Sequence, residues 1–255
     1  GVLETVPELG GIWVTPVNVE DLVDPIMTAI SAPYDLDPDL NGTDIQGWIP
    51  VTNYREALQQ IAFACGAYVT CSRAGLVQIK KTVLASEAVT FDYTVTKAQK
   101  SITNQSLTLK TLVTGVEVAA HNYVENTDVS ELYNGTLAAG SHTITFAAPA
   151  HDLSISGATI TESGANYAIV NVASPGTVVL SGEGYTDTTQ VTGVYNGALD
   201  PNVPTNILSI DGGTLVNPSN VAAITQRVYD YCQQRYVQKV KLFAPTAEPG
   251  KSVLI

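Results

Sequence analysis

The apolar residues near the amino terminus recur at the spacing of one helix face: Leu22, Val23, Ile26, Met27 and Ile30. They predict a helix from about Val19 to Ile30. Pro25 interrupts this pattern, because proline lacks an amide hydrogen and clashes with the preceding turn. It either begins a second short helix or kinks the first. The Asp-, Pro-, Asn- and Gly-rich stretch from Ser31 to Pro50 then predicts a loop.

The clearest helical pattern begins at Thr52 or Asn53. Asn53 and Glu56 have the spacing of a reciprocal capping pair, and apolar residues continue at helical spacing as far as Cys65. Gly66 is expected to end the helix. A hairpin is predicted next over residues 67–80, because two apolar stretches flank a turn sequence. The apolar faces of this helix and this hairpin can bury each other.

Between Thr82 and Ile210 the sequence shows no helical period. It has short apolar or alternating stretches, often about 8 to 12 residues apart, a spacing typical of a sandwich or barrel. These stretches are Leu107–Leu112, Gly115–Ala120, Thr143–Phe146, Leu153–Ile155, Tyr167–Val172 and Thr177–Leu180. The part from Leu137 to Tyr185 is the densest in such signals and is nearly devoid of basic side chains. We interpret it as a β insertion.

Asn217 and Pro218 suit the cap and first position of a last helix about five turns long. Its apolar stripe would consist of Val221, Ile224, Val228, Tyr231 and Cys232. A strand over 237–243, a turn over 248–251 and an apolar strand over 252–255 are expected to follow. This helix is expected to carry an aromatic and basic set, for which packing against strands or a neighbouring subunit is the best explanation. The set comprises Arg227, Tyr229, Tyr231, Arg235 and Tyr236.

These elements predict an α+β, predominantly β fold, with barrel- or sandwich-like β modules decorated by about three helices. We expect a helix-plus-hairpin module over 1–81. Residues 82–136 and 186–255 would form a β module closed by the carboxy-terminal helix and strands, with 137–185 as an inserted β subdomain. The composition agrees, because only 14% of the residues are charged and Thr, Ser, Asn and Gly replace the missing charge. Such residues favour strands and turns over long exposed helices.

The charge balance narrows the range of partners. Lys and Arg total 12 against 24 Asp and Glu, and the resulting net charge of −12 repels a polyphosphate backbone. We therefore expect no nucleic-acid partner. No apolar run approaches the ~20 residues of a membrane helix, so no membrane span is expected. Cys65, Cys71 and Cys232 form no CxxC pair and are expected to be buried free thiols.

The strongest apparent site is acidic. Asp37, Asp39 and Asn41 occupy the first, third and fifth positions of a calcium-loop opening, with Gly42 at the sixth. The twelfth position, where a bidentate glutamate belongs, is Trp48. We therefore prefer an Asx-rich turn to a calcium site and predict no bound metal, because Asp, Asn and Gly are also the residues that turns require.

No other motif indicates catalysis or cofactor binding, so we predict a protein that is not an enzyme and has no cofactor. His121, His142 and His151 are too far apart to show ligand spacing, although folding can gather such residues. The stretch 181–184 contains two glycines but no phosphate-loop lysine, and it is expected to be a turn. A glycoside hydrolase requires two paired carboxylates, for which Glu117 and Glu125 are examples of candidates, but the sequence does not establish that they pair.

Two segments resemble phage and prophage tail proteins. The stretch Gly47–Ala67 resembles a segment in which a helix of the form R-x-A-L-Q-Q-I-A precedes a small residue pair and a hairpin ending in a basic strand, here Gly75–Lys81. The carboxy-terminal sequences Val228–Tyr231, Gln234–Tyr236 and Glu248–Gly250 are similar to the closing module of tail hub and tail-tip proteins. Together the two segments cover roughly a third of the chain.

This resemblance implies a structural component of a bacteriophage or prophage tail, in a baseplate hub or tail tip. It implies helix-decorated β modules that assemble as a homo-oligomer, often a trimer, with other tail proteins as partners. Such a protein is made in the bacterial cytoplasm and resides in the virion tail. No catalytic residues carry over. The alternatives are a carbohydrate-binding or adhesion module, favoured by the Thr- and Asn-rich insertion, and a glycoside hydrolase.

Overall fold

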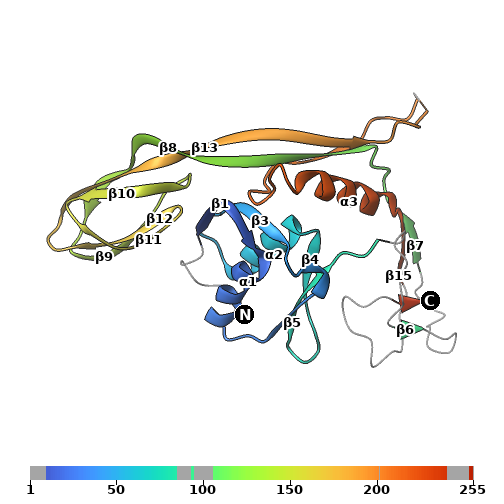
Figure 1. Ribbon diagram of the computed structural model, residues 1–255, viewed down its shortest axis with the longest axis horizontal. Coiled ribbons are helices and arrows are strands. Elements are labelled where there is room, and N and C mark those ends of the chain that lie inside the picture. Colours follow the sequence, from blue (N-terminus) through green and yellow to red (C-terminus); the bar gives the residue numbers. More distant parts are fainter. Residues whose placement is uncertain (1–9, 85–92, 95–105, 201, 240–252, 255) are drawn as a thin grey trace.

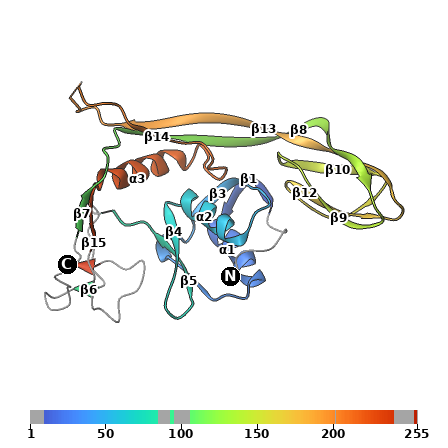
Figure 2. The ribbon, with the colours of Figure 1, turned by 180° about the vertical axis from the view of Figure 1, so that it is seen from behind.

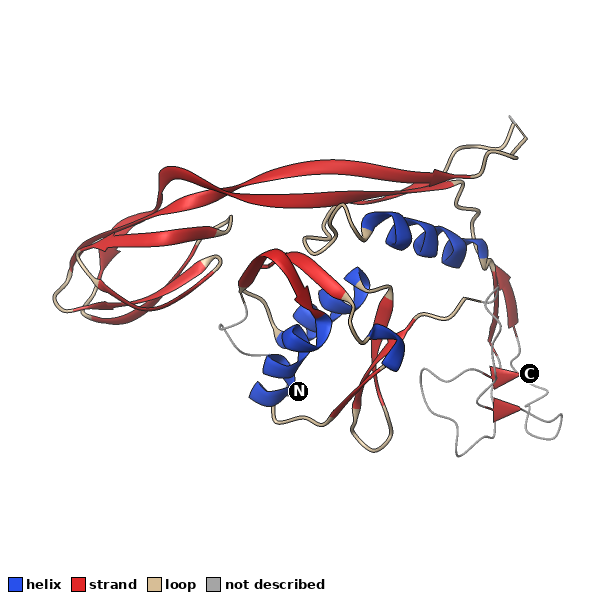
Figure 3. Cartoon of the chain, in the orientation of Figure 1, coloured by secondary structure: helices blue, strands red, loops and turns tan. Residues whose placement is uncertain are grey.

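The computed structural model describes residues 10–84, 93–94, 106–200, 202–239 and 253–254. With 51% strand and 18% helix, the protein is α+β and predominantly β, as the sequence predicts. The described residues form three α-helices, which lie among several small sheets (Figure 3). Within the described ranges no sheet closes into a barrel.

A long two-stranded ribbon runs along the molecule, and the other elements lie beneath it (Figure 1). It consists of β8 (Gly115–Leu137) and β13 (Gly176–Tyr195), which pair antiparallel along their length. The sequence predicts only short parts of these strands, over 115–120 and 177–180. The remainder is rich in exposed Thr, Asn and Asp, and it lacks the alternation that marks a half-buried strand.

The amino-terminal module lies beneath the middle of the ribbon (Figure 1). Its helices are α1 (Val19–Ala29) and α2 (Tyr54–Ala64). Its strands are β1 (Gly11–Asn18), β2 (Tyr34–Leu36), β3 (Asp44–Ile49), β4 (Ala67–Cys71) and β5 (Val77–Lys81), paired as β1–β3 and β2–β5–β4. The apolar sides of helices and sheets bury one another in a first hydrophobic core, which also includes Leu215 from the chain before the last helix.

Local sequence explains where these helices begin and end. Asn53 Oδ1 accepts a hydrogen bond from Glu56 N at 2.9 Å, which confirms the predicted cap, and the Glu56 carboxylate accepts from the Thr52 hydroxyl. Gly66 ends α2 with a left-handed φ of +66°. α1 is one helix with Pro25 inside it, and Pro25 is exposed, so the helical hydrogen bond it removes is lost on the solvent side.

The prediction of a loop from Ser31 to Pro50 is wrong. This stretch contains β2, the short 3-10 helix η1 (Pro38–Leu40) and β3. Both strands are short and depend on partners elsewhere in the sequence, since β2 pairs in parallel with β5 and β3 pairs antiparallel with β1. The turn-forming residues around η1 obscured the alternation in β3, where Ile45, Gly47 and Ile49 are all buried.

A distal β unit lies under one end of the ribbon (Figure 1). Three of its strands form a sheet in the order β11–β12–β9, and the fourth, β10, extends the sheet of the ribbon beside β13. The strands are β9 (Gly140–Thr145), β10 (Ala150–Ser156), β11 (Thr159–Gly164) and β12 (Tyr167–Val172). Their apolar faces form a second core that draws on residues between Leu132 and Leu180. β8 ends at Leu137, next to the expected unit boundary at 136, whereas β13 continues across the expected boundary at 185.

The prediction of a turn at Ser181–Gly184 is wrong, because these residues lie inside β13. The strand is irregular there, with register shifts at Leu180/Ser181 and Glu183/Tyr185. A Cβ on Gly182 would lie 2.6 Å from Leu153 Cδ2. The glycine therefore permits close packing against β10 rather than a chain reversal.

α3 (Val221–Gln233) packs beneath the other half of the ribbon and forms a third core with β8. It begins later than predicted and is shorter than five turns. Asn217 is buried and accepts a hydrogen bond from Ser219 N at 2.9 Å, so it organises the turn before the helix, and Asn220 takes the cap position.

The remaining strands are β6 (Tyr93–Thr94), β7 (Ser106–Leu109), β14 (Ile207–Ile210), β15 (Tyr236–Lys239) and β16 (Val253–Leu254). β14 pairs in parallel with β8, β7 pairs antiparallel with β15, and β6 pairs in parallel with β16. The predicted turn over 248–251 and the end of the strand predicted over 237–243 lie outside the described residues. None of the helices in the described ranges has the length and apolar character needed to cross a membrane.

Candidate interaction surface

The small sheet of β7 and β15 lies at the end of the molecule away from the distal β unit (Figure 2). It exposes large apolar side chains. Leu107, Leu109 and Tyr236 are 67%, 54% and 74% exposed. Tyr236 is paired with Leu109, and Leu107 lies two residues before Leu109, so all three side chains share one face. These three residues are named the β7–β15 strip.

β14 adds apolar surface at the same end (Figure 2). It is an edge strand whose described partner is β8, and Ile207 and Leu208 are 44% and 39% exposed. The free edge of such a strand presents unpaired backbone groups that can pair with another chain. The end of the molecule thus combines an apolar face with an open sheet edge.

One contact with α3, and hydrogen bonds between the residues that flank β7 and β15, hold this small sheet in place. The Lys110 ammonium lies 5.2 Å from the centroid of the Tyr231 ring, a cation–π contact. Lys110 N donates to Arg235 O at 2.8 Å, and Arg235 Nε donates to Lys110 O at 3.1 Å. Tyr231 was predicted in the apolar stripe of the helix, but it is 51% exposed because it covers Lys110 instead of the core.

A groove of about 520 Å³ lies between α2 and the chain from Ser209 to Val216. Phe63 and Gln60 line it from the helix, and Thr214 Oγ1 donates to Gln60 Oε1 at 3.3 Å. Glu56 also lines the groove. The pKa of its carboxyl group is lowered, mainly because the Thr52 hydroxyl donates a hydrogen bond to it. The groove offers amide and carboxylate groups beside one aromatic ring.

The calcium candidates Asp37, Asp39 and Asn41 lie in and beside η1. Asp37 accepts hydrogen bonds from Asp39 N and Lys81 N, both at 3.1 Å, and Asp39 forms an ion pair with Lys81 at 3.5 Å. The bond from Asp39 N is that of an Asx turn, the interpretation preferred from the sequence over a calcium site.

The three histidines belong to three different clusters. His121 Nδ1 lies 2.7 Å from an Asp187 oxygen, and His142 Nε2 lies 2.8 Å from Ala138 O. His151 Nδ1 lies 2.8 Å from an Asp152 oxygen. The fold therefore does not gather the histidines into one site.

The proposed hydrolase pair is far apart. Glu117 and Glu125 are eight positions apart in the extended strand β8, a distance of roughly 26 Å. Catalytic carboxyl pairs lie about 5 to 10 Å apart. Glu117 instead accepts a hydrogen bond from Tyr195 Oη at 2.6 Å, and this bond is the main cause that raises the pKa of Tyr195.

The distal β unit presents no exposed aromatic side chain, although the whole stretch 137–185 is described. Phe146 and Tyr167 are buried, and Tyr185 is half-buried. Stacking of sugar rings on such side chains is what would favour a carbohydrate-binding module. The insertion therefore offers no observation in support of that alternative.

The cysteines are free, but the prediction that all three are buried is wrong. Cys71 is exposed at the end of β4, whereas Cys65 and Cys232 are half-buried. Burial raises the pKa of the Cys65 thiol to about 12. Burial also raises the pKa of Cys232, and the charge of Lys110 partly offsets this effect.

The sequence indicates part of the interaction surface. The region of β7 was expected to be a strand, and Tyr236 was expected to pack against strands or a neighbouring subunit. The pairing of β7 with β15, which joins Leu109 to Tyr236 across more than a hundred residues, had no local signal.

Comparison of the chain with protein-family models, with curated proteins and with solved structures finds no match.

Proposed function

We propose that this protein is a structural component of a bacteriophage or prophage tail, of the hub or tail-tip kind, and that it acts through protein–protein interfaces. Its partners are further copies of the same chain, with a trimer favoured, and other tail proteins. The observation that carries the proposal is the exposed β7–β15 strip. The resemblance of the two segments around α2 and α3 to tail proteins supplies the biological setting.

The strip has the properties of a surface that is covered in an assembly. A two-stranded sheet alone is only marginally stable in water, and this one directs three large side chains to solvent. Burying each of them would contribute about 1.5 to 3 kcal/mol. A neighbouring copy that covers the strip would therefore stabilise both the sheet and the assembly.

The composition of this end suits an interface. Interface cores are depleted of charge and enriched in aromatic residues, and here exposed Leu and Tyr side chains lie at the same end of the molecule as the edge strand β14. If the β7–β15 strip of one copy contacts a different surface of the next copy, the contact is head-to-tail. Such contacts close into a ring when the rotation that relates neighbouring copies permits it. Ring closure through such contacts is compatible with a trimer.

The test measures the molar mass of the whole protein by light scattering over a range of concentrations. We expect a concentration-dependent oligomer for the wild type and a monomer for the double variant Leu107→Glu, Tyr236→Glu. Val129→Glu is the matched control, because Val129 is 66% exposed on β8, away from the strip. A wild type that stays monomeric, or a double variant that still assembles, would contradict self-assembly through the strip.

Membership of a tail is tested separately by the genes that flank the coding sequence. Tape-measure, terminase and tail genes beside it would support the proposal. A polysaccharide-utilisation cluster would contradict it and revive the carbohydrate-binding alternative.

A further inference from the structure

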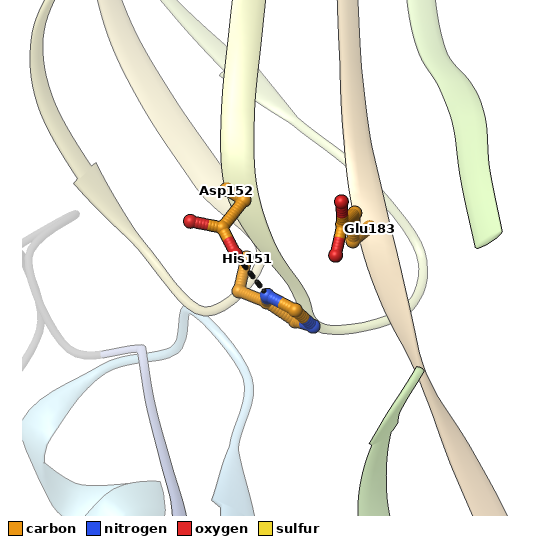
Figure 4. Close-up of side chains that lie close together, drawn as sticks. All are labelled: His151, Asp152 and Glu183. Atoms are coloured by element: carbon orange, nitrogen blue, oxygen red, sulfur yellow. Dashed lines mark hydrogen bonds and ion pairs between the residues drawn. The ribbon is translucent and has the colours of Figure 1, made fainter. Parts of the chain in front are cut away.

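His151 and Glu183 lie opposite each other where the sheet of the ribbon is irregular. His151 of β10 is in register with Glu183 of β13, so the two side chains share one face of the sheet. The register shifts just after His151 on β10 and just after Glu183 on β13. Figure 4 shows these side chains together with Asp152.

Asp152 brings a second carboxylate to the same side. Consecutive strand residues normally point to opposite faces, but Asp152 has a φ of +45°, in the left-handed region. Its Oδ2 atom consequently lies 2.8 Å from His151 Nδ1. One nitrogen of His151 and one oxygen each from Asp152 and Glu183 all lie within 4.8 Å of one another.

The His151 imidazole has hydrogen-bonding capacity that the described residues do not satisfy. Its Nδ1 atom contacts Asp152, whereas its Nε2 atom is buried and has no hydrogen-bond partner among them. The Tyr185 ring packs against the imidazole, with ring centroids 4.9 Å apart. A buried polar atom without a partner is unfavourable, and a bound ion is one of the ways in which proteins satisfy it.

Among the described residues, no Lys or Arg side chain lies within 4 Å of the carboxylates near His151. From residue 111 to residue 226 the sequence contains ten Asp and Glu residues and no Lys or Arg. Glu125 is in register with Tyr185, and its charge also acts on His151. Among the described residues, the His151 imidazole is the one basic group within 4 Å of the Asp152 or Glu183 carboxylate. The cluster therefore attracts a cation.

We propose that His151, Asp152 and Glu183 bind a divalent transition-metal ion, with Zn²⁺ as the preferred ion. One imidazole and two carboxylates are ligands that Zn²⁺ accepts, whereas Ca²⁺ and Mg²⁺ favour oxygen ligands alone. Ligand atoms in a tetrahedral zinc site lie roughly 3.4 Å apart, so the side chains rotate when the ion binds Nε2, and the Asp152 carboxylate leaves Nδ1 to join it. The ion ties β10 to β13 and does not depend on the assembly proposed above.

The experiment is a calorimetric titration of the untagged, EDTA-treated protein with ZnCl₂, repeated with CaCl₂ and MgCl₂. We expect one Zn²⁺ per chain and no saturable binding of Ca²⁺ or Mg²⁺. Glu183→Gln keeps the size of the side chain and removes a ligand, and it should weaken Zn²⁺ binding at least about tenfold. His142→Ala is the control, because His142 contacts the Ala138 carbonyl and no carboxylate in the described structure.

A second readout excludes loss of folding as the explanation. The metal-free Glu183→Gln protein should keep the wild-type circular dichroism spectrum, and Co²⁺ should give visible absorption bands with the wild type that change in the variant. Zn²⁺ binding of equal strength in wild type and Glu183→Gln would show that the ion binds elsewhere, for example at the exposed Cys71 thiol. That result, or an absence of saturable Zn²⁺ binding, would overturn the proposal.

Discussion

The Asn166 side chain joins the distal β unit to the amino-terminal module. Its Oδ1 atom accepts a hydrogen bond from Val51 N at 2.8 Å, and its Nδ2 atom donates to Phe146 O at 3.2 Å. Asn166 is 8% exposed, so water does not readily replace these bonds. One amide group thus satisfies backbone groups of two modules that lie far apart in the sequence.

Asn166→Ala should destabilise the protein, because it leaves Val51 N and Phe146 O without these bonds. We expect a loss of about 1 to 3 kcal/mol, which lowers the melting temperature by about 2 to 4 °C for each kcal/mol. Asn171→Ala, at an exposed position on β12, is the control and should change the stability by less than about 0.5 kcal/mol. Equal melting temperatures of the two variants would contradict the bridging role of Asn166.

Gly47→Ala should be more destabilising than Gly42→Ala, although both glycines have a positive φ. A Cβ on Gly47 would lie 2.2 Å from Thr214 O, whereas a Cβ on Gly42 would meet nothing within 4 Å. Backbone strain alone costs about 1 kcal/mol at Gly42. The clash at Gly47 should add about 1 to 3 kcal/mol, measured by urea unfolding. Equal losses would show that strain, not the contact between β3 and Thr214, decides the need for glycine.

The three thiols should react with a disulfide reagent at different rates. Cys71 is exposed, whereas burial raises the pKa of Cys65 to about 12 and leaves almost no thiolate there at neutral pH. We expect one fast thiol in the native protein, its loss in Cys71→Ser, and reaction of Cys65 only after unfolding. A fast phase that persists in Cys71→Ser would contradict the exposure of Cys71.

The stability contribution of His151 should depend on pH. Burial alone would lower the pKa of His151, but the hydrogen bond to Asp152 and the charges of Asp152, Glu125 and Glu183 raise it above the usual value. A raised pKa means that His151 binds its proton more tightly in the folded state than in the unfolded state. The contribution is then fully present below the unfolded-state pKa of about 6.5 and is lost as the pH rises through the folded-state value.

The corresponding measurement compares the wild type with His151→Asn by urea unfolding in EDTA, at about pH 5.5 and at about pH 8.5, on either side of the ordinary histidine pKa. The difference in unfolding free energy between the two proteins should be larger at the lower pH. A difference that stays constant or grows with pH would mean that the carboxylates do not favour the charged imidazole in the folded state.

Features that depend only on residues close together in the sequence could be predicted. Asn53 caps α2 and Gly66 ends it, because a cap and a left-handed terminus depend on neighbouring residues only. The β4–β5 hairpin follows for the same reason, since its strands flank one short turn. The capping prediction failed for α3, where Asn217 is drawn into a buried turn that lies against the β3 backbone at Gln46 O.

The candidate surface and the candidate metal site depend on register between distant strands. No local pattern places Leu109 beside Tyr236, or His151 opposite Glu183, because strand pairing is decided by which faces can be buried together. The exposed outer parts of β8 and β13 carry no alternation that would reveal them as strands. The positive φ of Asp152 likewise could not be predicted from the residue type alone.

The sequence by itself determined the α+β class, the positions of the three helices to within a few residues and the β4–β5 hairpin, because these follow from local hydrogen bonding and from the periodicity of apolar side chains. Only the tertiary structure decided the long ribbon of β8 and β13, the exposure of the β7–β15 strip and the cluster around His151. These features arise from long-range backbone pairing, whose energy depends on the partner strand and not on the strand's own sequence.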